Sequence, residues 1–163
     1  MDRVPLMKTM LSILLLSLAL SQGLAAQQSN TVPRKFSARI GGMLSVTFQI
    51  ELTDGALVYT SSRARENTEL VKIKPTVEQW REFRAALDDI NVWRWEPSYI
   101  NRKILDGTQW SLEIEYADRS IKTGGSNSYP DDKGQPNGQP QSTPAFARYR
   151  AAVEKLLGGK TFR

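Results

Sequence analysis

The chain has 163 residues, of which 40% are hydrophobic, a net charge of +5, and neither cysteine nor histidine. Without these two residue types it has no disulfide, no Cys- or His-ligated metal site, no haem attachment motif and no Ser-His-Asp or Cys-His nucleophile. Basic residues are interspersed with acidic ones, as in Arg81, Glu82 and Arg84. The charge therefore indicates solubility rather than nucleic-acid binding, and we expect no cofactor and no nucleic-acid partner.

The first 25 residues have the order of a secretory signal peptide. Arg3 and Lys8 precede an apolar run over residues 10–20, and small residues follow up to Ala25. A run of about 11 residues is too short for a spanning helix, which needs about 20. We expect cleavage near Ala25–Ala26 and export by the general secretion route to the bacterial periplasm or medium. No membrane span is expected after cleavage.

The remainder has the length of one domain. Removing 25 of the 163 residues leaves about 138, enough to build a hydrophobic core. Residues 26–35 are mostly polar and are predicted to be a flexible mature N-terminus. Residues 36–163 are predicted to form a single domain. Arg3, Lys8 and Asp2 give the leader a charge of +1, so the mature domain keeps about +4.

Alternation of apolar and polar residues predicts several strands. Residues 36–40 suggest a short strand, which we leave out of the predicted element order. The clearest pattern covers residues 46–52, followed by a turn at Asp54-Gly55 and a return over residues 56–61. Further strands are predicted at residues 70–73, 110–116 and 120–123.

Two amphipathic helices are predicted. The first begins at Thr76, which forms a capping-box sequence with Gln79, and its apolar stripe runs from Val77 to Ile90. The second begins at Thr143-Pro144 and ends at Gly158-Gly159. The element order is then β-β-β-α-β-β-α. It predicts an α+β fold, with an antiparallel sheet of about five strands and both helices on one face of that sheet.

Residues 124–143 contain four glycines and three prolines among many polar residues. This composition predicts a long mobile loop. Loops of that length inside compact domains are usually functional or disordered.

Unusual residues gather between Trp93 and Pro130. They include a W-x-W segment at residues 93–95, a D-G-x-x-W-x-L-x-I segment from Asp106 and a G-G-x-N-x-Y-P segment from Gly124. In this pattern the chain resembles a group of uncharacterised bacterial exported domains of unknown function, over roughly residues 36–158. The resemblance implies an α+β domain, with no assigned activity and no catalytic residues.

These residues have two interpretations. In the first, Trp110 belongs to the core, a tryptophan closes the end of the first helix, and Asp106 and Asn127 are turn residues. In the second, aromatic faces and polar groups line a groove for a sugar or a peptide. The groove residues are Trp95, Tyr99, Asp106, Asn127 and Tyr129. A nest of backbone N–H groups for an anion is predicted at Gly124, Gly125 and Ser126. No metal-ligand set is predicted.

Glu113 and Glu115 lie on the polar side of one predicted strand, about 7 Å apart. Paired carboxylates can hydrolyse glycosides, but a catalytic acid needs a raised pKa, and alternating glutamates are usually a solvated face. We therefore expect a non-catalytic exported module that binds an envelope protein or polymer. The alternatives are a carboxylate-dependent hydrolase of envelope polymers, and an inhibitor that inserts the 124–143 loop into an extracellular hydrolase.

Overall fold

The computed structural model describes residues 31–42, 45–63, 68–104 and 106–163. The predicted signal peptide, residues 1–25, and half of the predicted flexible segment lie outside these ranges. Within the described part of that segment, Pro33 is buried and the Arg34 amide donates to the Glu115 carbonyl (2.7 Å). No helix among the described residues is long and apolar enough to cross a membrane.

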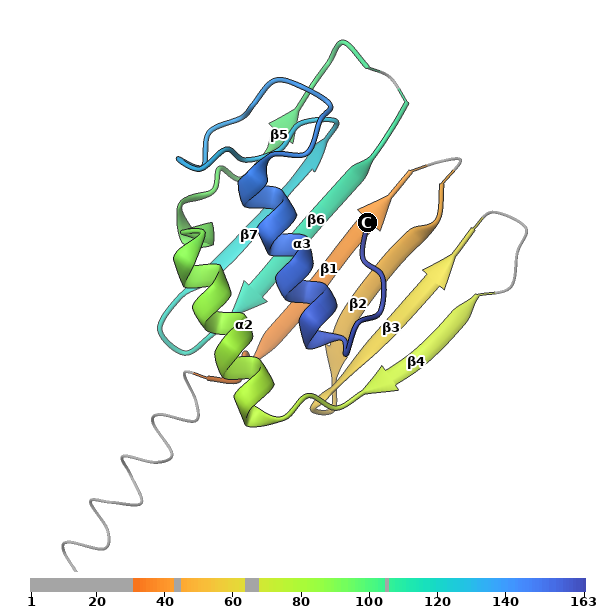
Figure 1. Ribbon diagram of the computed structural model, residues 1–163, viewed down its shortest axis with the longest axis vertical. Coiled ribbons are helices and arrows are strands. Elements are labelled where there is room, and N and C mark those ends of the chain that lie inside the picture. The colour runs from red at the N-terminus through yellow and green to blue at the C-terminus, as the bar shows by residue number, and fades with distance from the viewer. Residues whose placement is uncertain (1–30, 43–44, 64–67, 105) are drawn as a thin grey trace, which may run out of the picture.

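The described residues form one seven-stranded sheet (Figure 1), in the order β4-β3-β2-β1-β6-β7-β5. The strands are β1 (Lys35–Gly41), β2 (Thr47–Thr53), β3 (Ala56–Ser62), β4 (Glu69–Ile73), β5 (Tyr99–Ile100), β6 (Gln109–Glu115) and β7 (Ser120–Ser126). All neighbouring strands are antiparallel except β5 and β7, which are parallel.

The sheet corrects the prediction of about five antiparallel strands, because it has seven strands and is mixed. Strand β1, omitted from the predicted order, lies between β2 and β6 and joins the two halves of the sheet. Strand β5 has two residues, too few for alternation to be visible in the sequence. It pairs with β7 in parallel and makes the sheet mixed.

The α+β fold and its two helices, α2 (Val77–Asp89) and α3 (Pro144–Leu156), are confirmed. The capping box of α2 forms as predicted, with the Thr76 amide donating to Gln79 Oε1 (2.8 Å) and the Gln79 amide to Thr76 Oγ1 (3.2 Å). Helix α3 begins with Thr143 accepting a hydrogen bond from the Phe146 amide (3.1 Å). Figure 1 shows both helices on the same face of the sheet.

The helices leave the other face of the sheet accessible. On β1, Phe36, Ala38 and Ile40 are buried on the helix side, whereas Ser37 and Arg39 on the other side are half-buried. The same alternation holds on β6. We call the side without helices the open face. The prediction that Val77 belongs to the apolar stripe of the first helix was wrong. Val77 is the first residue of α2, and its side chain is 42% exposed.

The predicted loop begins later than expected, because β7 continues to Ser126. The rest of the segment carries several hydrogen bonds. Thr143 Oγ1 donates to the Pro130 carbonyl, and the Asn137 amide donates to the Tyr129 carbonyl (3.0 Å). The mobility of residues 127–143 stays a prediction.

Candidate functional site

The aromatic residues predicted to line a groove are instead buried in the core. Trp95 is 5% exposed, Tyr99 0% and Tyr129 5%. They surround Trp110 and Phe146, whose ring centroids lie 4.7 Å apart. Trp95 lies edge-on to Trp110, with centroids 6.1 Å apart, and Tyr129 stacks on Trp110 at 6.5 Å. These side chains present no aromatic face to a ligand, and their arrangement fits the packing interpretation.

The packing of the Trp110 ring explains why residue 125, the second residue of the G-G segment, is a glycine. Its indole Nε1 donates to the Ser128 carbonyl (3.0 Å), so its buried polar group is satisfied. A Cβ on Gly125 would lie 2.4 Å from that Nε1 and 2.7 Å from the Ser128 oxygen. The absence of a side chain at Gly125 is therefore required for this ring to pack.

The Asn127 side chain explains in the same way why residue 107 of the D-G turn is a glycine. It has a φ of +51°, and its Oδ1 accepts from the Thr108 amide (3.0 Å) while its Nδ2 donates to the Asp106 carbonyl (3.4 Å). A Cβ on Gly107 would lie 2.1 Å from Asn127 Oδ1. The exposed Asp106 side chain and the buried Asn127 side chain thus belong to a junction between two turns, and the structure does not bring them to a groove with Trp95.

The predicted anion nest at Gly124, Gly125 and Ser126 lies in strand β7. Gly125 pairs with Trp110 on one side and with Tyr99 on the other. Successive N–H groups in a strand point in alternate directions, whereas those of a nest converge. The backbone of these three residues therefore has the wrong conformation for a nest.

The two carboxylates of β6, Glu113 and Glu115, are ion-paired or exposed to solvent, as surface carboxylates usually are. Glu113 binds Lys35 Nζ at 2.8 Å and lies 3.7 Å from Lys122 Nζ. The hydrogen bond from Lys35 holds the pKa of Glu113 below its usual value, the opposite of what a general acid needs. Glu115 is exposed. Among the described residues, no cluster of three or more acidic side chains is placed to hold a metal ion.

Tyr99 is also unsuited to acid–base chemistry. Burial raises its pKa to about 12, so the phenol stays protonated at neutral pH. Its hydroxyl accepts from the Glu96 amide (2.6 Å) and donates to the Gly134 carbonyl (2.6 Å). These bonds attach the loop after β7 to the segment before β5, which is a structural role.

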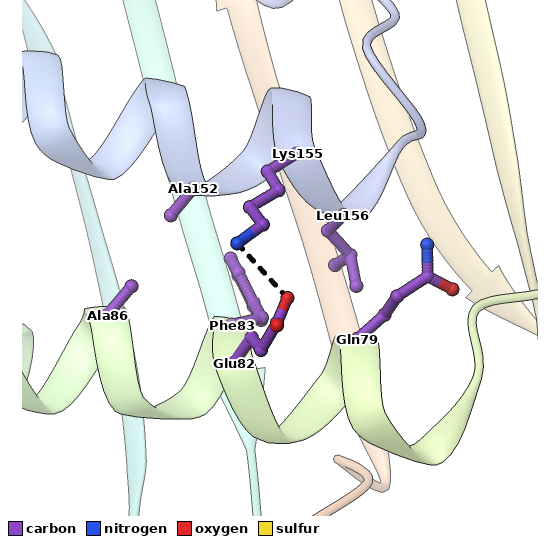
Figure 2. Close-up of a pocket in the computed structure, with 7 residues that line it drawn as sticks. All are labelled: Gln79, Glu82, Phe83, Ala86, Ala152, Lys155 and Leu156. Atoms are coloured by element: carbon purple, nitrogen blue, oxygen red, sulfur yellow. Dashed lines mark ion pairs between the residues drawn. The ribbon is translucent and has the colours of Figure 1, made fainter.

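The described part of the chain has a depression on each side of the sheet that is large enough to consider as a ligand site. The first, of about 190 Å³, lies between α2 and α3 (Figure 2). Phe83, Leu156 and two alanines give it an apolar lining, and an ion pair between Lys155 Nζ and Glu82 Oε2 (3.2 Å) joins the two helices beside it. The volume is small and its charged groups are already paired, so this depression leaves little for a ligand to contact.

The second depression lies on the open face and has a volume of about 340 Å³. The strand register builds it: Arg39 of β1 lies opposite Ser111 of β6, which lies opposite Gly124 of β7. Beside this row, Gln109 lies opposite Ser126, which pairs with Ile100 of β5. Since Gly124 lacks a side chain and the serines are small, the surface is hollow between Arg39 and Ile100. We call this hollow the open-face pocket.

The open-face pocket was missed by the sequence reasoning, which placed the site on the aromatic residues. The sequence indicates only that Arg39, Ser111 and Gly124 each lie on the polar side of a strand. Alternation alone could not show that the three residues are neighbours. Gly124 was singled out for its backbone, whereas in the structure it contributes space beside Ser111.

The chain was compared with protein-family models and with curated proteins, and no match was found in either comparison. The resemblance of the Trp93–Pro130 segment to uncharacterised exported domains therefore stays a prediction.

Proposed function

We propose that this protein is a non-catalytic binding module exported to the bacterial cell envelope, and that it binds its partner through the open-face pocket. The observation that carries the proposal is the row Arg39–Ser111–Gly124, which forms a hollow of about 340 Å³ on the face that the helices leave uncovered. Concave sites with a few convergent polar groups are where small ligands usually bind.

A binding role fits the side chains better than a hydrolytic one. The carboxylates offered by β6 are exposed or ion-paired, and the pKa of Glu113 is lowered. A glycosidase of the usual kind needs one carboxyl group that stays protonated near neutral pH. The export part of the proposal rests on the leader sequence, with its basic start, short apolar run and small residues before Ala26.

The proposal is tested with the full chain produced in a Gram-negative bacterium. Protein recovered from the periplasm should have the mass of a chain that begins near Ala26. This mature protein is then incubated with isolated cell envelopes, and the retained fraction is measured. Ser111→Phe should abolish retention, because the ring fills the open-face pocket from an exposed position. Thr60→Phe, on the open face of β3 away from the pocket, is the matched control and should leave retention unchanged.

Two results would contradict the proposal. Recovery of the intact leader in the cytoplasm would refute export. Equal retention of the wild type, Ser111→Phe and Thr60→Phe, or retention of none of them, would refute the pocket as the binding surface. Circular dichroism of each variant checks that the fold is kept.

A further inference from the structure

The open-face pocket holds a guanidinium group that has no counter-ion in the described structure. Arg39 is half-buried, and its side chain makes no ion pair and no hydrogen bond with any described residue. Its register neighbours are Gln49 and Ser111, which are both uncharged. Among the described residues that line the pocket there is no carboxylate. Glu51 and Glu113 lie one register step away on the same face, but neither forms an ion pair with Arg39, and Glu113 is paired with Lys35 and Lys122. A partly desolvated cation without an ion-pair partner favours a ligand that brings its own negative charge.

The rest of the pocket lining combines polar and apolar residues. Ser111, Ser126 and Gln109 provide hydroxyl and amide groups that can both donate and accept hydrogen bonds. Two apolar lining residues are exposed: Ile100, at 59%, and Pro97. The pocket therefore matches a ligand that has a charged group, several hydroxyl groups and a patch of C–H surface.

The hollow is a fixed property of the sheet. A Cβ on Gly124 would lie 2.8 Å from the Trp110 carbonyl oxygen, which belongs to the neighbouring strand backbone. The two strands thus approach closely only because residue 124 has no side chain. The pocket volume of about 340 Å³ is near the lower end of the range of ligand sites, about 300–1,000 Å³, so the ligand is small.

We infer that the open-face pocket binds an acidic sugar unit, with the Arg39 guanidinium on its carboxylate, its hydroxyl groups on Ser111, Ser126 and Gln109, and its C–H face against Ile100. This inference rests on the proposed function and names its ligand class. A carboxylate fits the planar guanidinium in a bidentate manner. It also carries a single negative charge that one arginine can balance, whereas a phosphate monoester carries about −1.5 to −2 at neutral pH.

The test is a titration of the ¹⁵N-labelled mature protein, followed by amide chemical shifts at about 0.15 M salt, where exposed charges are screened. The probes are tri-galacturonate, the neutral sugar maltotriose and inorganic phosphate. Tri-galacturonate should give saturable shifts at the amides of Ser111, Gly124 and Ser126. Maltotriose and phosphate should bind at least about tenfold more weakly. Maltotriose lacks the carboxylate, and phosphate lacks the sugar hydroxyl groups and the C–H face.

Two charge variants test the role of the guanidinium. Arg39→Gln should weaken tri-galacturonate binding by about tenfold or more, because a charge-assisted hydrogen-bond pair is lost. Lys72→Gln removes the same charge from β4 on the same face and should leave binding unchanged. If Arg39→Gln does not fold, the comparison of the three probes on the wild type decides the inference without it.

The inference is overturned by the absence of saturable shifts with tri-galacturonate, by tighter binding of phosphate or maltotriose, or by equal effects of Arg39→Gln and Lys72→Gln. Its failure is distinguishable from that of the proposed function. If tri-galacturonate does not bind but Ser111→Phe still abolishes envelope retention, the pocket remains a binding site and only the acidic-sugar assignment falls.

Discussion

Tyr99→Phe removes one oxygen atom that joins the segment before β5 to the loop after β7. The hydroxyl bonds the Glu96 amide and the Gly134 carbonyl, both at 2.6 Å, and Tyr99 is 0% exposed. The phenylalanine ring keeps the packing against Trp110, whose centroid lies 5.6 Å away, but leaves the two backbone groups without their partner. Tyr149→Phe is the matched control, because the buried Tyr149 hydroxyl has no hydrogen-bond partner among the described residues.

The expected magnitudes follow from this difference. A buried polar group left unsatisfied costs about 1–3 kcal/mol, so Tyr99→Phe should lower the free energy of unfolding by about 2–3 kcal/mol. Tyr149→Phe removes no bond to a described residue, and its effect should stay within about 0.5 kcal/mol. For a domain of this size, 1 kcal/mol corresponds to roughly 3–4 °C in Tm. The melting temperature of Tyr99→Phe should therefore fall by roughly 6–12 °C.

Thermal and urea unfolding of the mature protein, followed by far-UV circular dichroism, measure both effects. Equal losses for the two variants would refute the reasoning, because the two substitutions remove the same atom and differ in its hydrogen bonds. A larger loss for Tyr149→Phe would show that its hydroxyl has a partner that the described contacts do not include.

Two further substitutions test the ion pair between Arg84 of α2 and Asp118 (2.8 Å) and the glycine beside Trp110. The hydrogen bond from Arg84 holds the pKa of Asp118 at about 2, below its ordinary 3.8. The stabilisation of the fold by this ionised carboxylate is therefore present above its ordinary pKa and is lost as the pH falls through about 2. Asp118→Asn should cost about 1 kcal/mol at pH 6 and much less at pH 2 in urea unfolding. An equal cost at both pH values would contradict a charge effect. Gly125→Ala should cost about 3 kcal/mol and change the near-UV circular dichroism of Trp110, because the added methyl group overlaps the indole. An unchanged spectrum and stability would show that the ring moves freely.

The sequence by itself determined the two helices and the inward face of most strands, because these depend on local interactions. The capping box of Thr76 and Gln79 lies within four residues, and the hairpin turn at Asp54-Gly55 joins adjacent strands. The period of two likewise predicts that Trp110, Leu112 and Ile114 share a face, whatever the neighbouring strands are.

Local reasoning failed where the backbone departs from regular structure. The spacing of two between Trp93 and Trp95 in the W-x-W segment would put both rings on one face of an extended chain. In the structure Val92–Arg94 instead forms a 3₁₀-helix after the left-handed Asn91. Trp93 is therefore half-buried against Tyr116, whereas Trp95 is buried in the core. The crowding of tryptophans in the sequence suggested a ligand site, and the irregular turn instead places each indole in its own packing environment.

Only the tertiary structure decided the open-face pocket. Arg39, Ser111 and Gly124 are far apart in the chain, and each taken alone is a polar or small residue on the solvent side of a strand. They become neighbours because β1 pairs with β6, and β6 with β7. That strand order involves all seven strands, whose apolar side is buried beneath α2 and α3, so no one segment encodes it. A site made by register across three strands therefore has no local sequence signature.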